Sequence, residues 1–127
     1  MITTVLIVED ELLLALALRC TLASLGLKVL GTAKSFDEAI AKTNDLHPDL
    51  IVMDIHLEGD RNGVEAAESI RHFSHTPIVF QSSTTETEWI EKARRMPDSV
   101  FMSKTTSQSD WNSALGTFRI GNMGMVA

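Results

Sequence analysis

Short apolar runs alternate with longer segments of helical spacing along this 127-residue chain. Each run is rich in β-branched or leucine residues and is followed by polar or turn-forming residues, as in strands buried on both faces of a parallel sheet. This pattern predicts five strands, at Thr4 to Val8, Leu27 to Gly31, Asp49 to Asp54, Pro77 to Gln81 and Val100 to Met102.

The segments between these runs repeat apolar residues every three or four positions, which is typical of amphipathic helices. They predict five helices, at Asp10 to Leu25, Ser35 to Leu46, Gly63 to Phe73, Glu86 to Arg95 and Gln108 to Phe118. Regular alternation of strands and helices predicts an α/β fold, with a parallel sheet, helices on both faces and right-handed connections. Residues 1–120 then form one domain, and residues 121–127 form a flexible C-terminal tail.

The first helix is unusual because it is apolar over much of its circumference. One stripe of apolar residues recurs at helical spacing: Leu12, Leu13, Leu16, Ala17 and Cys20. Two further leucines, Leu14 and Leu18, lie outside this stripe. This pattern predicts a well-buried helix in which the cysteine serves packing. The alternative is a helix whose apolar face forms a dimer contact.

Composition narrows the classes of partner. The net charge of −6 argues against a nucleic-acid surface, which needs a basic face. The single cysteine allows no internal disulfide and favours a reducing, cytoplasmic location. The acidic run Glu9 to Glu11 interrupts the apolar N-terminus, so no secretory signal is expected, and the run Leu12 to Leu18 is shorter than the roughly 20 residues that span a bilayer. We therefore expect a cytoplasmic protein with no nucleic-acid or membrane partner.

Polar residues follow four of the five predicted strands. Glu9 and Asp10 follow the first strand, Asp54 ends the third, Ser82 follows the fourth, and Lys104 lies just past the fifth. In a doubly wound sheet of strand order 2-1-3-4-5 these four strands are neighbours, and their carboxyl ends line one crevice. The sequence therefore predicts that these five side chains share one site.

Such a cluster favours phosphoryl chemistry. Carboxylates held within a few ångströms repel one another, and a hard divalent cation such as Mg²⁺ or Mn²⁺ relieves that repulsion. A carboxylate such as Asp54, flanked by a cation and by the ammonium of Lys104, can attack phosphorus. The Ser82 hydroxyl can then donate to the transferred phosphoryl oxygens.

The same motifs resemble those of the receiver domains of two-component response regulators. Over residues 3 to about 118, the matching motifs are Val8 to Glu11, Val52 to Asp54, the pair Ser82 and Ser83, and Lys104. The resemblance implies a CheY-like fold of the flavodoxin type, and phosphorylation of Asp54 by a histidine kinase or a histidine phosphotransfer protein. It also implies that Asp10, Asp54 and the backbone carbonyl of His56 bind Mg²⁺ or Mn²⁺, with Glu9 helping through a water molecule.

The resemblance further implies a switch. Ser82 moves toward the phosphate and Phe101 turns inward, which reshapes the face formed by residues 86–118 for an unknown downstream protein. A homodimer that forms on phosphorylation is a second option for this output. The resemblance implies a signalling protein and not an enzyme.

One departure from the family and three alternatives stay open. The family usually has Pro after the lysine, with the bond between them cis, whereas here Thr105 follows Lys104, and a cis bond costs about 3–4 kcal/mol before Thr against about 0.5–1 before Pro. This motivates the first alternative, a degenerate receiver that acts as a docking module without phosphorylation. An aspartate-nucleophile phosphatase needs a second carboxylate two residues after the nucleophile, where this chain has His56. A flavin carrier needs a phosphate-binding loop, which the acidic run Glu9 to Glu11 disfavours.

Overall fold

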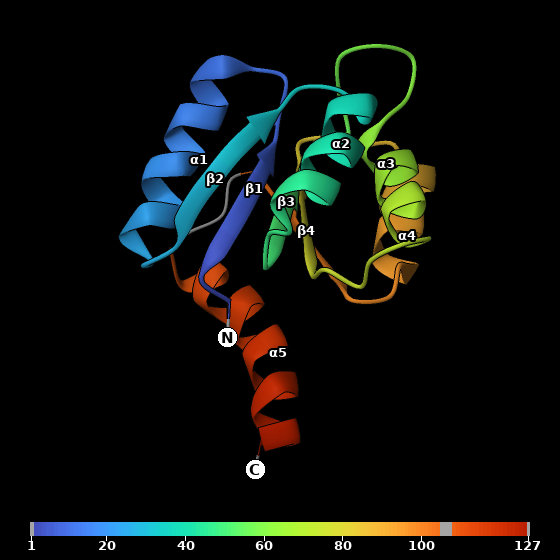
Figure 1. Cartoon of the computed structure of the whole chain (residues 1–127). Helices are drawn as coiled ribbons and strands as arrows, with labels where there is room; N and C mark the ends of the chain where they lie inside the picture. Colours follow the sequence, from blue (N-terminus) through green and yellow to red (C-terminus); the bar gives the residue numbers. More distant parts are fainter. Residues whose placement is uncertain (1, 105–107, 127) are drawn as a thin grey trace.

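The computed structural model describes residues 2–104 and 108–126, which fold as a parallel sheet covered by helices on both faces (Figure 1). The strand order is β2-β1-β3-β4-β5, which confirms the predicted fold class. The strands are β1 (Thr4–Val8), β2 (Lys28–Ala33), β3 (Leu50–Met53), β4 (Ile78–Ser82) and β5 (Ser99–Ser103).

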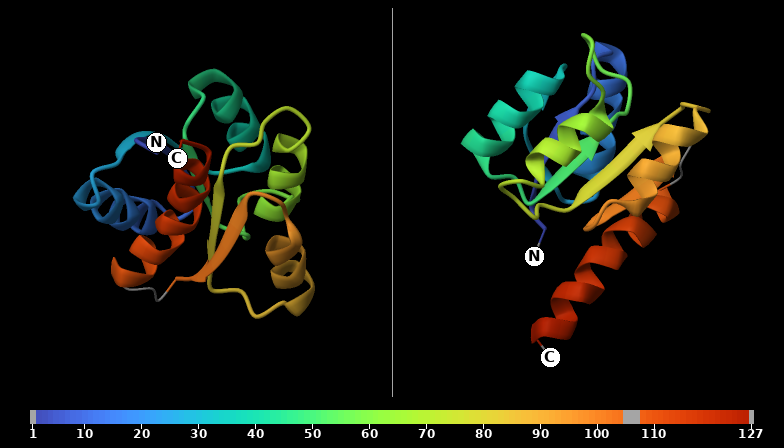
Figure 2. Two further views of the ribbon diagram at one scale, coloured as in Figure 1. Left: turned by 90° about the horizontal axis from the view of Figure 1, so that it is seen from below. Right: turned by 90° about the vertical axis from the view of Figure 1, so that its right-hand side faces the viewer.

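The five helices divide between the two faces of the sheet. Figure 2 shows α1 and α5 together on one face, with α2, α3 and α4 on the other. The helices are α1 (Leu12–Ser24), α2 (Phe36–Leu46), α3 (Gly63–Ile70), α4 (Thr87–Arg95) and α5 (Gln108–Val126). Each face has its own apolar core: Phe80 packs in the core beneath α2, α3 and α4, whereas Trp111 packs in the core beneath α1 and α5.

Strand β3 lies at the centre of the sheet. All four of its residues are buried, because β1 and β4 flank it and helices cover both of its faces. Asp49, just before β3, accepts hydrogen bonds from the backbone N–H groups of Thr3 and Thr4 and from the Thr3 hydroxyl, at 2.9–3.0 Å. This carboxylate ties the start of β1 to the start of β3 and so helps to set the register of the strands that carry the site.

Local capping explains where two helices begin. The Ser35 hydroxyl accepts a hydrogen bond from the Glu38 N–H, which confirms the predicted start of α2. Helix α3 begins with a capping box between Asn62 and Glu65, each side chain accepting from the other's backbone N–H at 3.0 Å. The sequence pattern of Asn followed three residues later by Glu could have revealed this second cap.

The structure corrects the interpretation of α1. The helix begins at Leu12, with Glu11 as its N-cap, and not at Asp10 as predicted. All thirteen helical residues are described, and of these Ala15 and Leu22 alone are buried. A sheet covers only one side of a helix that lies on it. The side of α1 that meets the sheet carries Ala15, Leu18 and Leu22. The predicted stripe faces solvent: Leu13 is 80% exposed, and Cys20 is exposed as well. The prediction of a well-buried helix with a packed cysteine is therefore wrong.

Helix α5 is longer than predicted. It continues to Val126, past the expected end at Phe118, and its final turns project beyond the sheet (Figure 1). No proline interrupts the segment, and glycines weaken a helix without breaking it. The helix therefore extends into the predicted C-terminal tail, while the flexibility of residues 121–127 and the domain boundary at residue 120 stay predictions. None of the helices in the described ranges is long and apolar enough to cross a bilayer.

Candidate functional site

The site lies at the carboxyl ends of β1, β3, β4 and β5, where sheet pairing continues one residue past two of the strands. The Asp54 N–H donates to the Val8 carbonyl, and the Glu9 N–H donates to the Ala33 carbonyl, each at 2.9 Å. The backbone of both residues is therefore fixed by hydrogen bonds of the sheet. Each residue is 5% exposed.

Three carboxylates meet at this edge. One oxygen from each of Glu9, Asp10 and Asp54 lies within 4.8 Å of the others, and Asp10 is the most exposed of the three. The Glu11 N–H donates to Glu9 Oε2 at 3.2 Å and helps to fix that side chain. The structure thus brings together the three acidic residues that the sequence placed at one crevice.

Lys104 reaches the same cluster from the end of β5. Its Nζ lies 2.8 Å from Asp54 Oδ2 and 2.9 Å from Glu9 Oε1, so one ammonium bridges two buried carboxylates. Residues separated by 50 and 95 positions in the chain are joined in this way. The Lys104 to Thr105 bond, which departs from the family pattern, lies outside the described residues.

The electrostatics of the cluster leave room for a further cation. Burial raises the pKa of Glu9 to about 7; the Asp54 charge acts in the same direction, while the hydrogen bond from Lys104 opposes both. Burial alone lowers the pKa of Lys104, but its hydrogen bonds to Asp54 and Glu9 outweigh this effect and raise the pKa. The site holds three carboxyl groups and one ammonium. The carboxyl groups offer only oxygen ligands, which fit a hard divalent cation such as Mg²⁺ or Mn²⁺.

The segment between β3 and α3 packs tightly against Asp54. The His56 N–H lies 3.3 Å from Asp54 Oδ1, and the Gly63 N–H donates to the Ile55 carbonyl at 2.7 Å. A Cβ on Gly63 would lie 1.9 Å from the Asp54 carbonyl oxygen, so this position has no room for a side chain. Sequence reasoning missed the role of Gly63, which only the close approach of two backbone segments reveals.

The same segment is also held from outside. The Glu58 N–H donates to the Lys34 carbonyl at 3.0 Å, which joins the loop after β3 to the loop after β2. The Arg61 guanidinium stacks 3.9 Å from the centre of the Phe36 ring. The loop that follows Asp54 is therefore anchored to α2 as well as to α3.

Ser82 ends β4, and Phe101 lies on the neighbouring strand. Ser82 is 2% exposed, and its hydroxyl accepts a hydrogen bond from the Thr84 N–H at 3.3 Å. Phe101 is partly buried on the α4 side of the sheet, where the Arg94 guanidinium lies 5.5 Å from its ring centre. The two predicted switch residues thus lie on neighbouring strands, Ser82 on β4 and Phe101 on β5.

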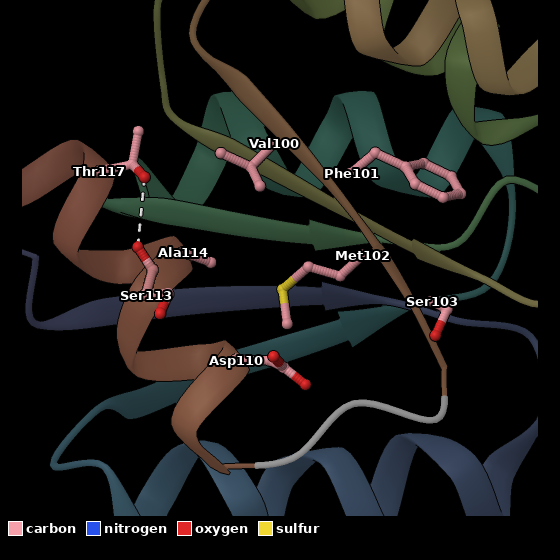
Figure 3. Close-up of a pocket in the computed structure, with 8 residues that line it drawn as sticks. All are labelled: Val100, Phe101, Met102, Ser103, Asp110, Ser113, Ala114 and Thr117. Carbon is pink, nitrogen blue, oxygen red and sulfur yellow. Dashed lines mark hydrogen bonds between the residues drawn. The ribbon is translucent and has the colours of Figure 1, made fainter.

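A pocket of about 400 Å³ lies between β5 and α5, lined by residues of both elements. Figure 3 shows Val100 and Met102 on the α5 side of the strand and Phe101 pointing away from it. This alternation is expected, because neighbouring residues of a strand face opposite sides of a sheet. This shallow, open pocket lies within residues 86–118, the segment for which the sequence predicts an output face.

Comparison with known proteins gives one family and a consistent set of relatives. The response regulator receiver domain matches residues 5–115. The chain is 34% identical over 112 residues to a protein-glutamate methylesterase/protein-glutamine glutaminase of Methanosarcina acetivorans, covering 86% of this chain and 32% of that protein. It is 32% identical over 106 residues to the transcriptional regulatory protein PdtaR of Mycobacterium tuberculosis, covering 84% and 51%. The chain thus spans about a third of the length of the first relative and about half of the second.

Solved structures agree with the sequence comparison. The signal receiver domain of a modulated diguanylate cyclase from Desulfovibrio desulfuricans superposes with a TM-score of 0.81 at 34% identity, over 92% of this chain and 93% of that one. The receiver domain of the PhyR response regulator from Erythrobacter litoralis gives a TM-score of 0.77 at 27% identity, over 91% and 88%. The predicted resemblance is confirmed.

Proposed function

Because this chain belongs to the response regulator receiver domains, we propose that Asp54 accepts a phosphoryl group from a phosphohistidine. The donor is a histidine kinase or a histidine phosphotransfer protein. The observation that carries the proposal is the Lys104 ammonium lying 2.8 Å from Asp54 within a cluster of three carboxylates.

In the proposed step, an Asp54 carboxylate oxygen attacks phosphorus. The new O–P bond forms as the P–N bond to the donor histidine breaks, and the bonding pair returns to the imidazole nitrogen. Lys104 stays protonated, because its pKa is raised. Its positive charge stabilises the negative charge on the phosphoryl oxygens in the transition state. Backbone hydrogen bonds hold Asp54 in place, so little reorganisation is needed before the attack.

The proposed cation site uses Asp10, Asp54 and the backbone carbonyl of His56, with Glu9 acting through a water molecule. The donor set fits Mg²⁺ or Mn²⁺, and Asp10 is open enough to exchange ligands with solvent. When bound, such a cation neutralises charge on the phosphoryl oxygens. Lys104 hydrogen-bonds both Glu9 and Asp54, so the ammonium would share these two carboxylates with the cation.

The proposed output is a change in the face formed by α4, β5 and α5. The Ser82 hydroxyl, which accepts from the Thr84 N–H, would move and donate its own proton to a phosphoryl oxygen, and Phe101 would turn toward the space released. A downstream protein would read the altered face. The competing function is a docking module that binds its partner without phosphorylation.

The experiment is intact-mass analysis after incubation with a small phosphoramidate donor, with and without Mg²⁺. We expect a gain of one phosphoryl group that requires Mg²⁺ and that hydroxylamine removes, as for an acyl phosphate. Asp54→Asn should abolish the gain, and Asp60→Asn, which changes an exposed carboxylate in the same loop, should leave it intact.

Absence of labelling in the wild type, with folding intact, would favour the docking module. Labelling of Asp54→Asn at the wild-type level would contradict the assignment of the acceptor.

A further inference from the structure

The outer face of α1 is apolar, and no described part of the chain covers it. Leu12, Leu13 and Leu16 remain 65%, 80% and 48% exposed, and Ala17 and Cys20 between and beyond them are exposed too. These five residues, called here the α1 outer face, lie on one side of the helix because they recur at helical spacing. A contiguous apolar patch of this kind often marks an interaction site.

We propose that the α1 outer face binds the same face of a second copy of this chain, with the two helices antiparallel. The face is divided by size: its first half carries leucines and its second half carries Ala17 and Cys20, followed by the exposed Ala23. In an antiparallel pair, the large residues of one copy lie against the small residues of the other. A twofold axis near Leu16 and Ala17 places Leu13 of one copy opposite Cys20 of the other.

Charge favours a second copy on this face. Between Leu12 and Leu25 the helix carries a single charged residue, Arg19, although the chain has a net charge of −6. Two like-charged molecules approach with least repulsion through a face without acidic groups. A twofold interface must also be self-complementary, which the large and small halves of this face satisfy.

The size of the face sets the strength of the contact. The exposed leucines offer on the order of 300 Å² of apolar surface, well below the roughly 800 Å² per partner of a standard stable interface. The dimer is therefore weak and exchanges with monomer, and we expect its dissociation constant to lie in the micromolar to millimolar range. It needs no phosphoryl group, so Asp54→Asn should dimerise as the wild type does, and the proposal stands apart from the proposed function.

The test is sedimentation velocity of the full chain, reduced and unphosphorylated, across a concentration series. We expect the wild type to show a concentration-dependent dimer, and Leu13→Gln to weaken it by roughly tenfold or more, since one buried leucine is lost from each copy. Leu46→Gln, which changes an exposed leucine on α2, is the matched control and should have no effect.

A second variant separates shape from general stickiness. Ala17→Leu adds apolar surface but fills the small half of the face, so close helix packing requires that it weaken the dimer. If Ala17→Leu strengthens association, or if the wild type stays monomeric throughout the series, the proposal is wrong. In the monomeric case the α1 outer face serves another protein.

Crosslinking tests the antiparallel register. Leu13→Cys, with native Cys20 retained, should form a disulfide dimer on mild oxidation, because the two positions face each other between copies. Within one helix they lie about 10 Å apart, too far for a disulfide. Leu46→Cys should crosslink markedly less, and equal crosslinking by both variants would contradict the register.

Discussion

Gly63 lies directly against the backbone of Asp54, so that a Cβ at position 63 would come within 1.9 Å of the Asp54 carbonyl oxygen. It would also lie 2.9 Å from the Met53 side chain, which is fully buried. Neither neighbour can retreat, because β3 is packed on both faces. The first turn of α3 is thereby held against the strand that carries the candidate acceptor.

Gly63→Ala should destabilise the fold by about 1–3 kcal/mol, the usual cost of overpacking a closed core. It should also slow phosphoryl labelling of Asp54, because the clash pushes α3 and the Asp54 backbone apart and displaces the acceptor carboxylate. Urea unfolding and phosphoramidate labelling measure the two effects. Gly116→Ala is the control, since nothing lies within 4 Å of its Cβ, and it should be neutral or slightly stabilising.

Lys104→Met should separate cation binding from phosphoryl transfer. Removing the ammonium leaves Glu9 and Asp54 without their shared partner, so affinity for Mg²⁺, measured by calorimetry, should hold or rise. Labelling of Asp54 should fall by roughly a hundredfold, the usual loss when a charge that stabilises the transition state is removed. Lys34→Met, at an exposed position, should change neither quantity; a loss of Mg²⁺ affinity in Lys104→Met would contradict the arrangement proposed for the site.

Asp49 should make the stability of the fold depend on pH in the acid range. Burial favours a higher pKa for this carboxyl, but hydrogen bonds from Thr3 and Thr4 outweigh it and lower the pKa below its usual value. A carboxyl whose pKa is lower in the folded state stabilises the fold above its unfolded pKa of about 3.9, and that contribution is lost as the pH falls through the folded value.

Urea midpoints measured from pH 7 down to pH 2 provide the check. Asp49→Asn should be less stable at pH 7, and its difference from the wild type should shrink as the pH falls below about 4. Asp45→Asn, at an exposed position on α2, should track the wild type throughout. A difference between Asp49→Asn and wild type that stays constant with pH would contradict the role given to this carboxylate.

Replacing Arg71 even by lysine should lower the stability of the fold. Its guanidinium donates to the carbonyls of Ser74, Pro97 and Asp98 at 3.0–3.3 Å, which ties the end of α3 to the turn before β5. A lysine cannot reproduce the planar set of donors. Arg71→Lys should therefore cost about 1–3 kcal/mol in urea unfolding, while the exposed Arg95→Lys should be neutral within error.

The sequence alone predicted most of the site because of a property of parallel sheets. A residue that directly follows a strand must lie at the carboxyl edge, whatever the remaining packing. Glu9, Asp10, Asp54 and Ser82 could therefore be assigned from their places after apolar runs, and the motif resemblance led to the same residues. Lys104 also follows a strand, but its contact with both Glu9 and Asp54 depends on how β5 lies relative to β1 and β3.

Helix α1 illustrates what the sequence left undecided. Its composition specified a helix, yet Leu13 and Ala15 are both apolar, and no local pattern states which of them faces the sheet. Packing of the whole helix chose the stripe of Ala15, Leu18 and Leu22 and left the leucines at 12, 13 and 16 in solvent.

The sequence by itself determined the alternation of strands and helices and the chemistry gathered at one edge, because strand and helix periodicities are local. Tertiary structure alone decided the close approach of Gly63 to Asp54, the bridge made by Lys104 and the exposed face of α1. Those features depend on distances between segments far apart in the chain, which packing of the complete backbone sets.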